Sequence, residues 1–410
     1  MEDLVPPIRQ VSPVPQRAVI VLPSTGAFDG RAHRIAAGLA ARGHDVTVVA
    51  RPGPGLDADA LDPSGYRIKR AGRGAPAGLR TPLRQIRQLQ AIVSQRAAAV
   101  AATHGTAAGT ADLIHAMGLM GLPVGIALRE HLGGRLVYDA RDLYVDAGNL
   151  ARLPAPLRGA AGAVERRWAR SADRVVTVND ALADLLRDRL GCERPVVVLN
   201  ASPVRAHEGP RPRRFHERLQ LADETPVVLY QGGFSPGRGI PELIAAISEV
   251  PGAHLVLLGY GRLDDDLRAR AARPDVAGRV SVLPAVPPGE LLEWVASADV
   301  VAIPIQGDTL NHRLATPNKL FEALAAGVPV VASDLPGMAS IVRELEAGTL
   351  VDPTRPAAIA AGIRALLDPP PDARAATRAR IRAATAGRYD WPAQFDRLLA
   401  EYTRLTGRPW

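Results

Sequence analysis

The sequence lacks the residues and segments on which several protein classes depend. Its 410 residues include one cysteine, Cys192, so neither an internal disulfide nor a cysteine-rich metal site can form. No apolar run approaches the roughly 18–20 residues that a membrane-spanning helix needs. The first residues, Met1 to Asp3, are acidic and lead into prolines, a pattern unlike the basic and apolar regions of a signal peptide. We therefore expect a cytoplasmic protein.

Lysine is almost absent as well. Only Lys69 and Lys319 are lysines among the 50 basic Lys and Arg residues, and Ala, Gly and Pro are abundant. This bias is typical of a GC-rich genome, so the net charge of +8 partly reflects background composition. The rarity of lysine makes the place of each one informative.

The basic residues cluster between residues 66 and 100, a stretch that has no Asp or Glu. Its eight cations are Arg67, Lys69, Arg70, Arg73, Arg80, Arg84, Arg87 and Arg96. One interpretation is a solvated helix face with a loop, and another is contact with anionic lipid or an acidic acceptor at the inner membrane face. No aromatic side chains that stack on bases are interleaved, so we expect no nucleic-acid partner.

Buried strands alternate with amphipathic helices along most of the chain. A strand at 18–22, a loop, a helix at 31–42 and a strand at 45–50 predict a right-handed βαβ unit, and a second such series starts at Pro226. The fold class is therefore α/β, with two doubly wound Rossmann-like domains of about six parallel strands each. Such sheets bind ligands beyond the carboxyl ends of their strands, so we expect the two domains to face a central cleft. The expected boundaries are a flexible tail at 1–17, domains at 18–205 and 206–388, and a C-terminal helical segment at 389–410.

The stretch from Thr316 to Ser333 predicts a helix followed at once by a buried strand. Thr316 suits an N-cap and Pro317 the first helical position, and the next two backbone N–H groups, of Asn318 and Lys319, have no partner inside the helix. A helix N-terminus with an added cation favours phosphate. Glu322, three residues after Lys319, is placed to accept hydrogen bonds from vicinal hydroxyls such as those of a ribose. The stretch predicts a site for a nucleotide diphosphate.

A glycine-rich loop opens the second half of the chain, between a strand ending near Tyr230 and a helix from about Ile240. Gly232 and Gly233 allow backbone N–H groups to approach a ligand, and Arg238 adds a bidentate donor. Together, Arg238 and Lys319 predict a two-cation clamp for a diphosphate. Three residues after neighbouring strands, which also fit plain turns, are candidates for contact with the base: Gly259, Tyr260 and Val286.

Candidate ligand contacts in the first half also follow strands. Gly26 and Gly30 permit close approach of a ligand but do not form the G-x-G-x-x-G pattern of a nicotinamide enzyme. The cleft candidates after later strands are His115, Asp139, Arg141 and Asp142; the alternatives are a structural histidine and an Asp–Arg pair that holds its loop. No metal-ligand spacing occurs, so we expect no metal and no cofactor beyond a nucleotide sugar as co-substrate.

These residues resemble a known family. Pro317 to Glu322, with the sequence PNKLFE, and Ala326 to Ser333 resemble the signature of the retaining glycosyltransferase family 4, which has the GT-B fold. The resemblance covers nearly all of 18–405. It implies that the second domain binds a nucleotide-diphosphate sugar, that the first binds the acceptor, and that the final helix crosses back to the first domain. It further implies metal-independent transfer with retention, in which Lys319 and Arg238 stabilise the leaving diphosphate.

The chain departs from the family at three positions. Leu314 stands where members often carry a Glu close to the donor sugar, so the sugar would be recognised through the backbone of 316–318. Gly233 replaces a frequent second basic residue, for which Lys319 would compensate. Arg141 stands where many members have a histidine.

The leading hypothesis is a hexosyltransferase that uses a UDP- or GDP-sugar and a small-molecule, glycan or lipid-linked acceptor. A sugar-nucleotide epimerase of the same fold would carry acid and base side chains that the sequence does not place. A non-catalytic sugar-nucleotide-binding or partner protein remains the alternative from another class, and Leu314 favours it.

Overall fold

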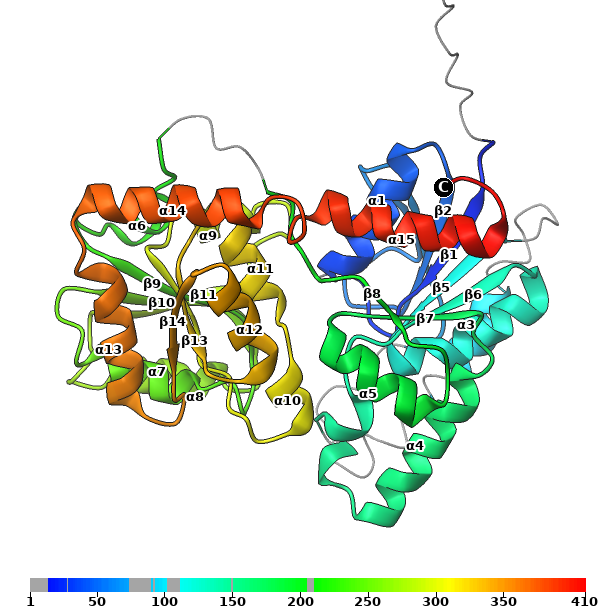
Figure 1. Cartoon of the computed structure of the whole chain (residues 1–410), viewed down its shortest axis with the longest axis horizontal. Helices are drawn as coiled ribbons and strands as arrows, with labels where there is room; N and C mark the ends of the chain where they lie inside the picture. The colour runs from blue at the N-terminus through cyan, green and yellow to red at the C-terminus, as the bar shows by residue number, and fades with distance from the viewer. Residues whose placement is uncertain are drawn as a thin grey trace, which may run out of the picture. The chain divides into compact units, whose positions relative to one another are not determined.

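The computed structural model describes residues 14–27, 29–73, 90, 93–101, 111–148, 150–204 and 210–410. Two β-sheets, each flanked by helices, organise these residues (Figure 1). The pair of β3 with β4 is antiparallel, and the other strand pairs with an assigned register are parallel. The predicted architecture of two α/β domains is therefore confirmed.

The first sheet has eight strands in the order β3-β4-β2-β1-β5-β6-β7-β8. Its strands are β1 (Arg17–Val21), β2 (Asp45–Ala50), β3 (Asp59–Leu61), β4 (Arg67–Arg70), β5 (Leu113–Met117), β6 (Arg135–Asp139), β7 (Arg174–Thr177) and β8 (Val196–Val197). The expectation of about six strands was too low because β3 and β4 lack an apolar run: four of their seven residues are charged, and all seven are exposed or half-buried. The helices and 3₁₀ turns of this region are α1 (Gly30–Ala41), α3 (Gly118–Leu132), η1 (Tyr144–Asp146), η2 (Leu150–Arg152), α4 (Ala155–Ala169) and α5 (Asp180–Leu190).

The second sheet has six parallel strands in the order β11-β10-β9-β12-β13-β14. These are β9 (Val227–Phe234), β10 (His254–Gly261), β11 (Val280–Pro284), β12 (Val300–Ile303), β13 (Val330–Ser333) and β14 (Gly348–Val351). The helices are α6 (Arg214–Leu219), α7 (Ile240–Ile247), α8 (Asp264–Ala271), α9 (Leu291–Ala296), α10 (Leu310–Leu314), α11 (Asn318–Ala325), α12 (Pro336–Glu344), α13 (Pro356–Leu367), α14 (Pro371–Thr385) and α15 (Trp391–Thr406).

The second sheet is buried on both faces, as its apolar strands predict. Successive residues of β9 point to opposite sides: Leu229 belongs to a core cluster with residues of α11 and α12, whereas Val228 belongs to another with residues of α7 and α13. Both residues are fully buried. A parallel sheet covered by helices on both faces is the doubly wound arrangement.

The chain divides into two compact units, which are described separately below. The first comprises Met1–Asp139, Ser171–Arg174 and Arg397–Trp410, and the second comprises Ala140–Arg170 and Val175–Asp396. The end of α15 and the C-terminal residues thus belong with the N-terminal strands, as expected for a final helix that returns to the first domain. There the Trp410 ring packs on the His44 ring at 4.8 Å, and Gln16 Nε2 donates to Pro409 O at 2.6 Å.

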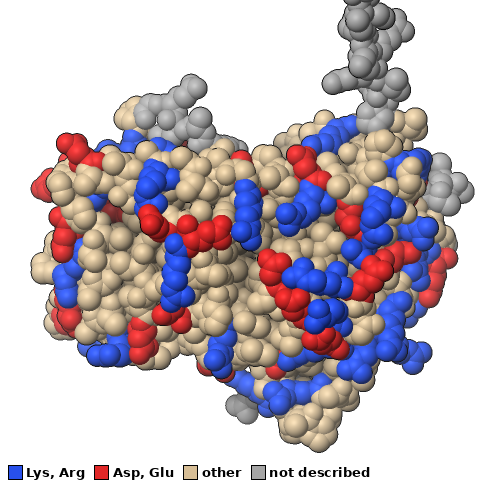
Figure 2. Space-filling model, viewed as in Figure 1, with Lys and Arg blue, Asp and Glu red and all other residues tan. Residues whose placement is uncertain are grey.

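The basic segment of 66–100 is described only in part. Within it, Arg67 lies in β4 and pairs with Asp59 at 3.0 Å, and Arg96 lies 3.5 Å from Glu130. Arg80, Arg84 and Arg87 lie outside the described residues. Figure 2 shows acidic and basic side chains interspersed over much of the visible face. Among the helices that the structure describes, none is long and apolar enough to cross a bilayer.

Candidate nucleotide-sugar site

The helix α11 presents its first turn at the carboxyl-end edge of the second sheet. It begins at Asn318, one residue later than predicted, because Pro317 is its N-cap residue with extended backbone (φ −70°, ψ 150°). Thr316 is therefore not the N-cap; its buried hydroxyl accepts a hydrogen bond from Asn179 Nδ2 at 3.2 Å. The first N–H groups of α11 have no partner within the helix, which leaves them for an anion.

The end of α11 matches the sequence prediction. Gly327 adopts φ +67°, and its N–H donates to Leu324 O at 2.9 Å. The N–H of Val328 donates to Ala323 O at 2.8 Å. This pair of bonds is a Schellman motif, which stops the helix and turns the chain directly into β13.

Lys319 is the unusual side chain of this edge. It is only 8% exposed, and among the described residues no group hydrogen-bonds its ammonium. The Nζ atom lies 3.4 Å from the centroid of the Tyr230 ring, a cation–π contact. Burial, and next the nearby charge of Arg238, lower the pKa of Lys319 well below its usual value. The negative charge of Glu322 opposes this shift but does not cancel it. The buried nitrogen of Lys319 therefore has no acceptor within the part of the chain that the structure describes.

The predicted strand end near Tyr230 is too early: β9 continues to Phe234, because Gly232 and Gly233 still pair with β10. This glycine pair lies beside Lys319. A Cβ atom on Gly232 would sit 3.7 Å from Lys319 Cε and Nζ, and Gly232 itself adopts φ +116°. Gly239 has φ +67°, and a Cβ there would lie 1.9 Å from Pro304 O, so only glycine fits. Arg238 lies between these two glycines in the sequence, directly before Gly239, and is half-buried. Its charge contributes to the lowered pKa of Lys319, so the two predicted cations lie near one another.

Glu322 follows Lys319 by one turn and is half-buried. Gln231 Nε2 donates to Glu322 Oε2 at 3.4 Å, while Gln231 Oε1 is buried without a partner among the described residues. Gln231 is the last residue before the glycine pair, and the sequence prediction did not include it. Its signal was a polar residue at the end of an otherwise apolar strand.

The residues expected near the base lie at the same edge. Register pairs Gly259 with Gly232 and Tyr260 with Gly233. A Cβ on Gly259 would lie 2.0 Å from Gly232 O, so this glycine is required by the close approach of β9 and β10. Tyr260 is 54% exposed, and Val286 is half-buried. The close approach of the two strands therefore explains why residue 259 is a glycine, without a ligand. The Tyr260 ring, by contrast, is exposed.

A second group at this edge was not predicted. His312 Nδ1 lies 2.6 Å from Asp308 Oδ1, one helical turn apart at the start of α10. A Cβ on Gly237 would lie 2.9 Å from Asp308 Oδ2 and 3.0 Å from His312 Cε1. The pair therefore packs on the glycine-rich loop. Its only sequence signal was an acidic residue and a histidine four positions apart.

Leu314, which stands at the position of the missing Glu, is the last residue of α10. Its carbonyl oxygen accepts a hydrogen bond from Asn179 Nδ2 at 2.9 Å. The next residues, 315–317, lead into α11. Sugar recognition through this backbone remains a prediction.

The candidates in the first unit form a buried network. Arg31 donates to both oxygens of Asp139, from Nε at 2.7 Å and from a terminal nitrogen at 3.3 Å. His115 Nε2 lies 3.1 Å from the same carboxylate, and Tyr402 OH lies 2.7 Å from His115 Nδ1. All four side chains are at most 1% exposed. His115 and Asp139 therefore present no atom to solvent, and the geometry supports positioning roles.

The remaining first-half candidates are placed differently. Gly26 has φ +79°, and Gly30 is the first residue of α1, directly before Arg31. Asp142 belongs to the second unit, where its Oδ1 accepts a hydrogen bond from Asn311 Nδ2 at 3.0 Å. Arg141 is half-buried. At this strand end Asp139 pairs with Arg31 of α1.

Comparisons with known proteins agree with this geometry. Residues 29–201 match the family described as Glycosyl transferase 4-like domain, and residues 225–369 match Glycosyl transferases group 1. The chain belongs to glycosyltransferase family 4. A D-inositol 3-phosphate glycosyltransferase from Acidothermus cellulolyticus is 30% identical over 313 residues, which are 72% of this chain and 67% of the relative. Another from Segniliparus rotundus is 31% identical over 305 residues, 71% of this chain and 66% of the relative. The chain thus spans about two thirds of the length of these relatives.

Solved structures share the fold of this family 4 chain at lower identity. Sucrose-phosphate synthase from Thermosynechococcus elongatus has a TM-score of 0.74 at 20% identity, with 96% of this chain and 99% of that one covered. Anabaena HepE, in complex with UDP and glucose, has a TM-score of 0.70 at 19% identity, with 95% and 100% covered. These likenesses identify the fold as GT-B.

Proposed function

We propose that this protein transfers a hexose from a UDP- or GDP-sugar to an acceptor hydroxyl, with retention and without a metal. The observation that carries the proposal is the buried ammonium of Lys319. Among the described residues it has no hydrogen-bond acceptor, and it lies at the start of α11 beside Gly232, in the glycine-rich segment 232–239 that also carries Arg238. An unpaired cation at a helix N-terminus suits a diphosphate.

The proposed chemistry follows from charge. As the glycosidic bond to the diphosphate breaks, negative charge grows on the leaving oxygens. Lys319, Arg238 and the first N–H groups of α11 would stabilise that charge more than they stabilise the bound substrate, which is the condition for faster transfer. Glu322, which accepts a hydrogen bond from Gln231, would accept hydrogen bonds from the ribose hydroxyls as well. Metal independence is part of the proposal because two side-chain cations already oppose the diphosphate.

A thermal-shift panel of UDP-, GDP-, dTDP- and ADP-sugars tests donor binding, because a ligand of the native state raises the melting temperature. Nucleotide release with acceptor then tests transfer. The names of the curated relatives make D-inositol 3-phosphate the first acceptor to try. A panel without any stabilisation would overturn the proposal.

The second candidate is a non-catalytic sugar-nucleotide-binding protein, favoured by Leu314 at the position of a customary sugar contact. Stabilisation by one donor, with no nucleotide release across a broad set of acceptors, would select this function. Release that depends on both donor and acceptor would select the transferase.

A further inference from the structure

A cavity of about 540 Å³ lies at the opposite edge of the second sheet from Lys319. Its lining includes Asp299, Pro329 and Gly348, which stand at or directly before the amino ends of β12, β13 and β14. The candidate nucleotide-sugar site lies beyond the carboxyl ends of strands in the same sheet. The cavity is therefore separate from that site, and its volume suits a small organic ligand.

The cavity is lined by more cations than anions. Five arginines face two carboxylates in its lining: Arg211, Arg374, Arg378, Arg380 and Arg382, with Asp299 and Glu346. Three of them, Arg374, Arg378 and Arg382, are spaced four residues apart on α14 and so share one face of that helix. Like charges at this spacing repel one another, so the stripe needs compensating negative charge.

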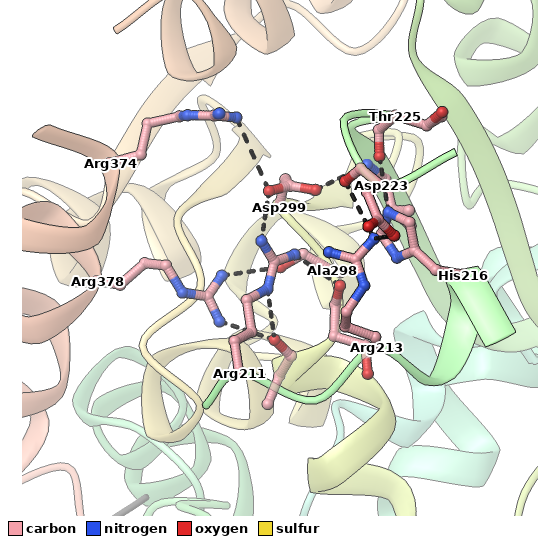
Figure 3. Close-up of polar contacts among 12 residues, drawn as sticks. Arg211, Arg213, His216, Asp223, Thr225, Ala298, Asp299, Arg374 and Arg378 are labelled. Carbon is pink, nitrogen blue, oxygen red and sulfur yellow. Dashed lines mark hydrogen bonds and ion pairs between the residues drawn. The ribbon is translucent and has the colours of Figure 1, made fainter. Parts of the chain in front are cut away.

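Two of the arginines have structural partners (Figure 3). Arg378 donates to Ala298 O and Ala296 O, each at 2.8 Å, and Arg211 donates to Ser297 O at 2.6 Å and to Asp299 Oδ1 at 2.7 Å. These carbonyls end α9, whose C-terminus favours cations. Burial, with the charge of Arg211, lowers the pKa of Arg378 to about 9, which leaves it charged at neutral pH.

Asp299 is a single carboxylate that Arg211 and Arg374 share. Its Oδ2 accepts a hydrogen bond from Val227 N at 2.8 Å, and Arg374 lies 3.8 Å from Oδ1, the oxygen that Arg211 contacts. Arg374 Nε is buried with no hydrogen-bond partner among the described residues. Arg380 donates to Leu345 O at 2.9 Å and lies 3.6 Å from Glu346. Within the described part of the chain, Arg374 thus has a buried Nε without an acceptor, and Arg382 has no carboxylate partner.

We propose that this cavity binds a small phosphate monoester, with its phosphate held by Arg374 and Arg382. A planar guanidinium matches two phosphate oxygens at once, and a dianion would offset the net charge of the lining. The apolar part of the lining, which includes Ala296, Leu366 and Pro369, would contact the carbon part of the ligand. A sugar phosphate has this combination of groups.

Titration calorimetry with glucose 6-phosphate tests the site, with glucose as the uncharged comparison. We expect saturable binding by the full chain, persisting in saturating UDP, and none of glucose. The double variant R374A/R382A should bind at least about tenfold more weakly, because two charge-assisted contacts are lost. The matched control R268A/R270A removes two exposed arginines of α8 and should bind like the original protein.

Three results would overturn the proposal: no saturable binding, equal affinity in the double variant, or displacement by UDP. The single variant Arg382→Ala provides a second test if the double variant does not fold, because the Arg382 side chain is half-buried and is not part of the buried core. Sedimentation with phosphatidylglycerol vesicles separates a lipid phosphate from a free one. Vesicle binding that depends on Arg374 and Arg382, without glucose 6-phosphate binding, would also reject a soluble ligand. None of these outcomes bears on the proposed donor binding at Lys319, which is tested separately.

Discussion

Replacement of Lys319 by methionine is the perturbation that bears most directly on the proposed transfer. Methionine keeps the length and apolar stem of the side chain and removes only the ammonium. Because Lys319 Nζ lies 3.4 Å from the Tyr230 ring centroid and has no acceptor among the described residues, the substitution breaks no hydrogen bond. Its effect on the fold and its effect on the reaction can therefore be separated.

The two effects have opposite signs. Loss of one preorganised charge donor from a transition state costs about 2–4 kcal/mol, so turnover should fall roughly 30- to 900-fold. The free energy of unfolding should instead rise by about 1 kcal/mol, because functional sites commonly hold groups that destabilise the fold. The cation–π contact with Tyr230 limits this gain.

The assay measures nucleotide release with donor and acceptor, beside urea unfolding of the same variant. Lys69→Met is the matched control, since Lys69 lies in β4 of the other sheet and is the only other lysine. It should leave turnover unchanged. Near-original turnover in Lys319→Met, or an equal loss in both variants, would refute the diphosphate clamp.

The lowered pKa of Lys319 adds a test by pH. A bound diphosphate favours the charged ammonium, so the pKa should rise on binding and the protein should take up a proton. Donor affinity should then fall as pH rises between the pKa of the free and the bound protein. Calorimetry in two buffers of different ionisation enthalpy measures this uptake, which Lys319→Met should abolish. Without a donor, stability should rise with pH from the lowered pKa of Lys319 toward its unfolded value, because the unfolded chain binds more protons there.

Three further substitutions test other parts of the structure. Glu322→Gln should weaken donor binding about tenfold in calorimetry while unfolding is nearly unchanged, and unaltered affinity would remove the ribose role. Gly239→Ala should lower the free energy of unfolding by more than about 2 kcal/mol, because the new Cβ would lie 1.9 Å from Pro304 O at a positive φ; a stable, active variant would contradict that geometry. Tyr402→Phe should cost about 1–2 kcal/mol by urea unfolding, since it removes the 2.7 Å bond to His115, and no loss would show that the bond is dispensable.

Local patterns determined most of the second domain. The apolar strands, the glycine that ends α11 and the run into β13 are set by short-range propensities, which is why their predicted places agree with the structure. The exception is β9, which continues past its predicted end near Tyr230 to Phe234 because its glycines pair with β10. The candidate cations Arg238 and Lys319 were also visible in the sequence, because a basic residue near a glycine turn or a helix start has few structural explanations. Their convergence then followed from the parallel sheet, whose strand ends share one edge.

Other features depend on contacts between residues far apart in the chain. The prediction placed His115 and Asp139 at a cleft because both end strands, but burial and hydrogen bonds to Arg31 and Tyr402 place them in the interior. Strand ends alone do not tell whether a polar residue faces solvent or a buried partner. The partner here comes from the last helix, 287 residues away from His115 in sequence.

The sequence by itself thus determined the α/β class, the two domains and the cationic start of α11, since these depend on periodicity and on residues near one another in the chain. Only the tertiary structure decided that the ammonium of Lys319 is buried against Tyr230, and that arginines from α14 and the segment before α6 meet at Asp299. Burial and charge balance are properties of the packed molecule, because they depend on which distant groups exclude water from a side chain.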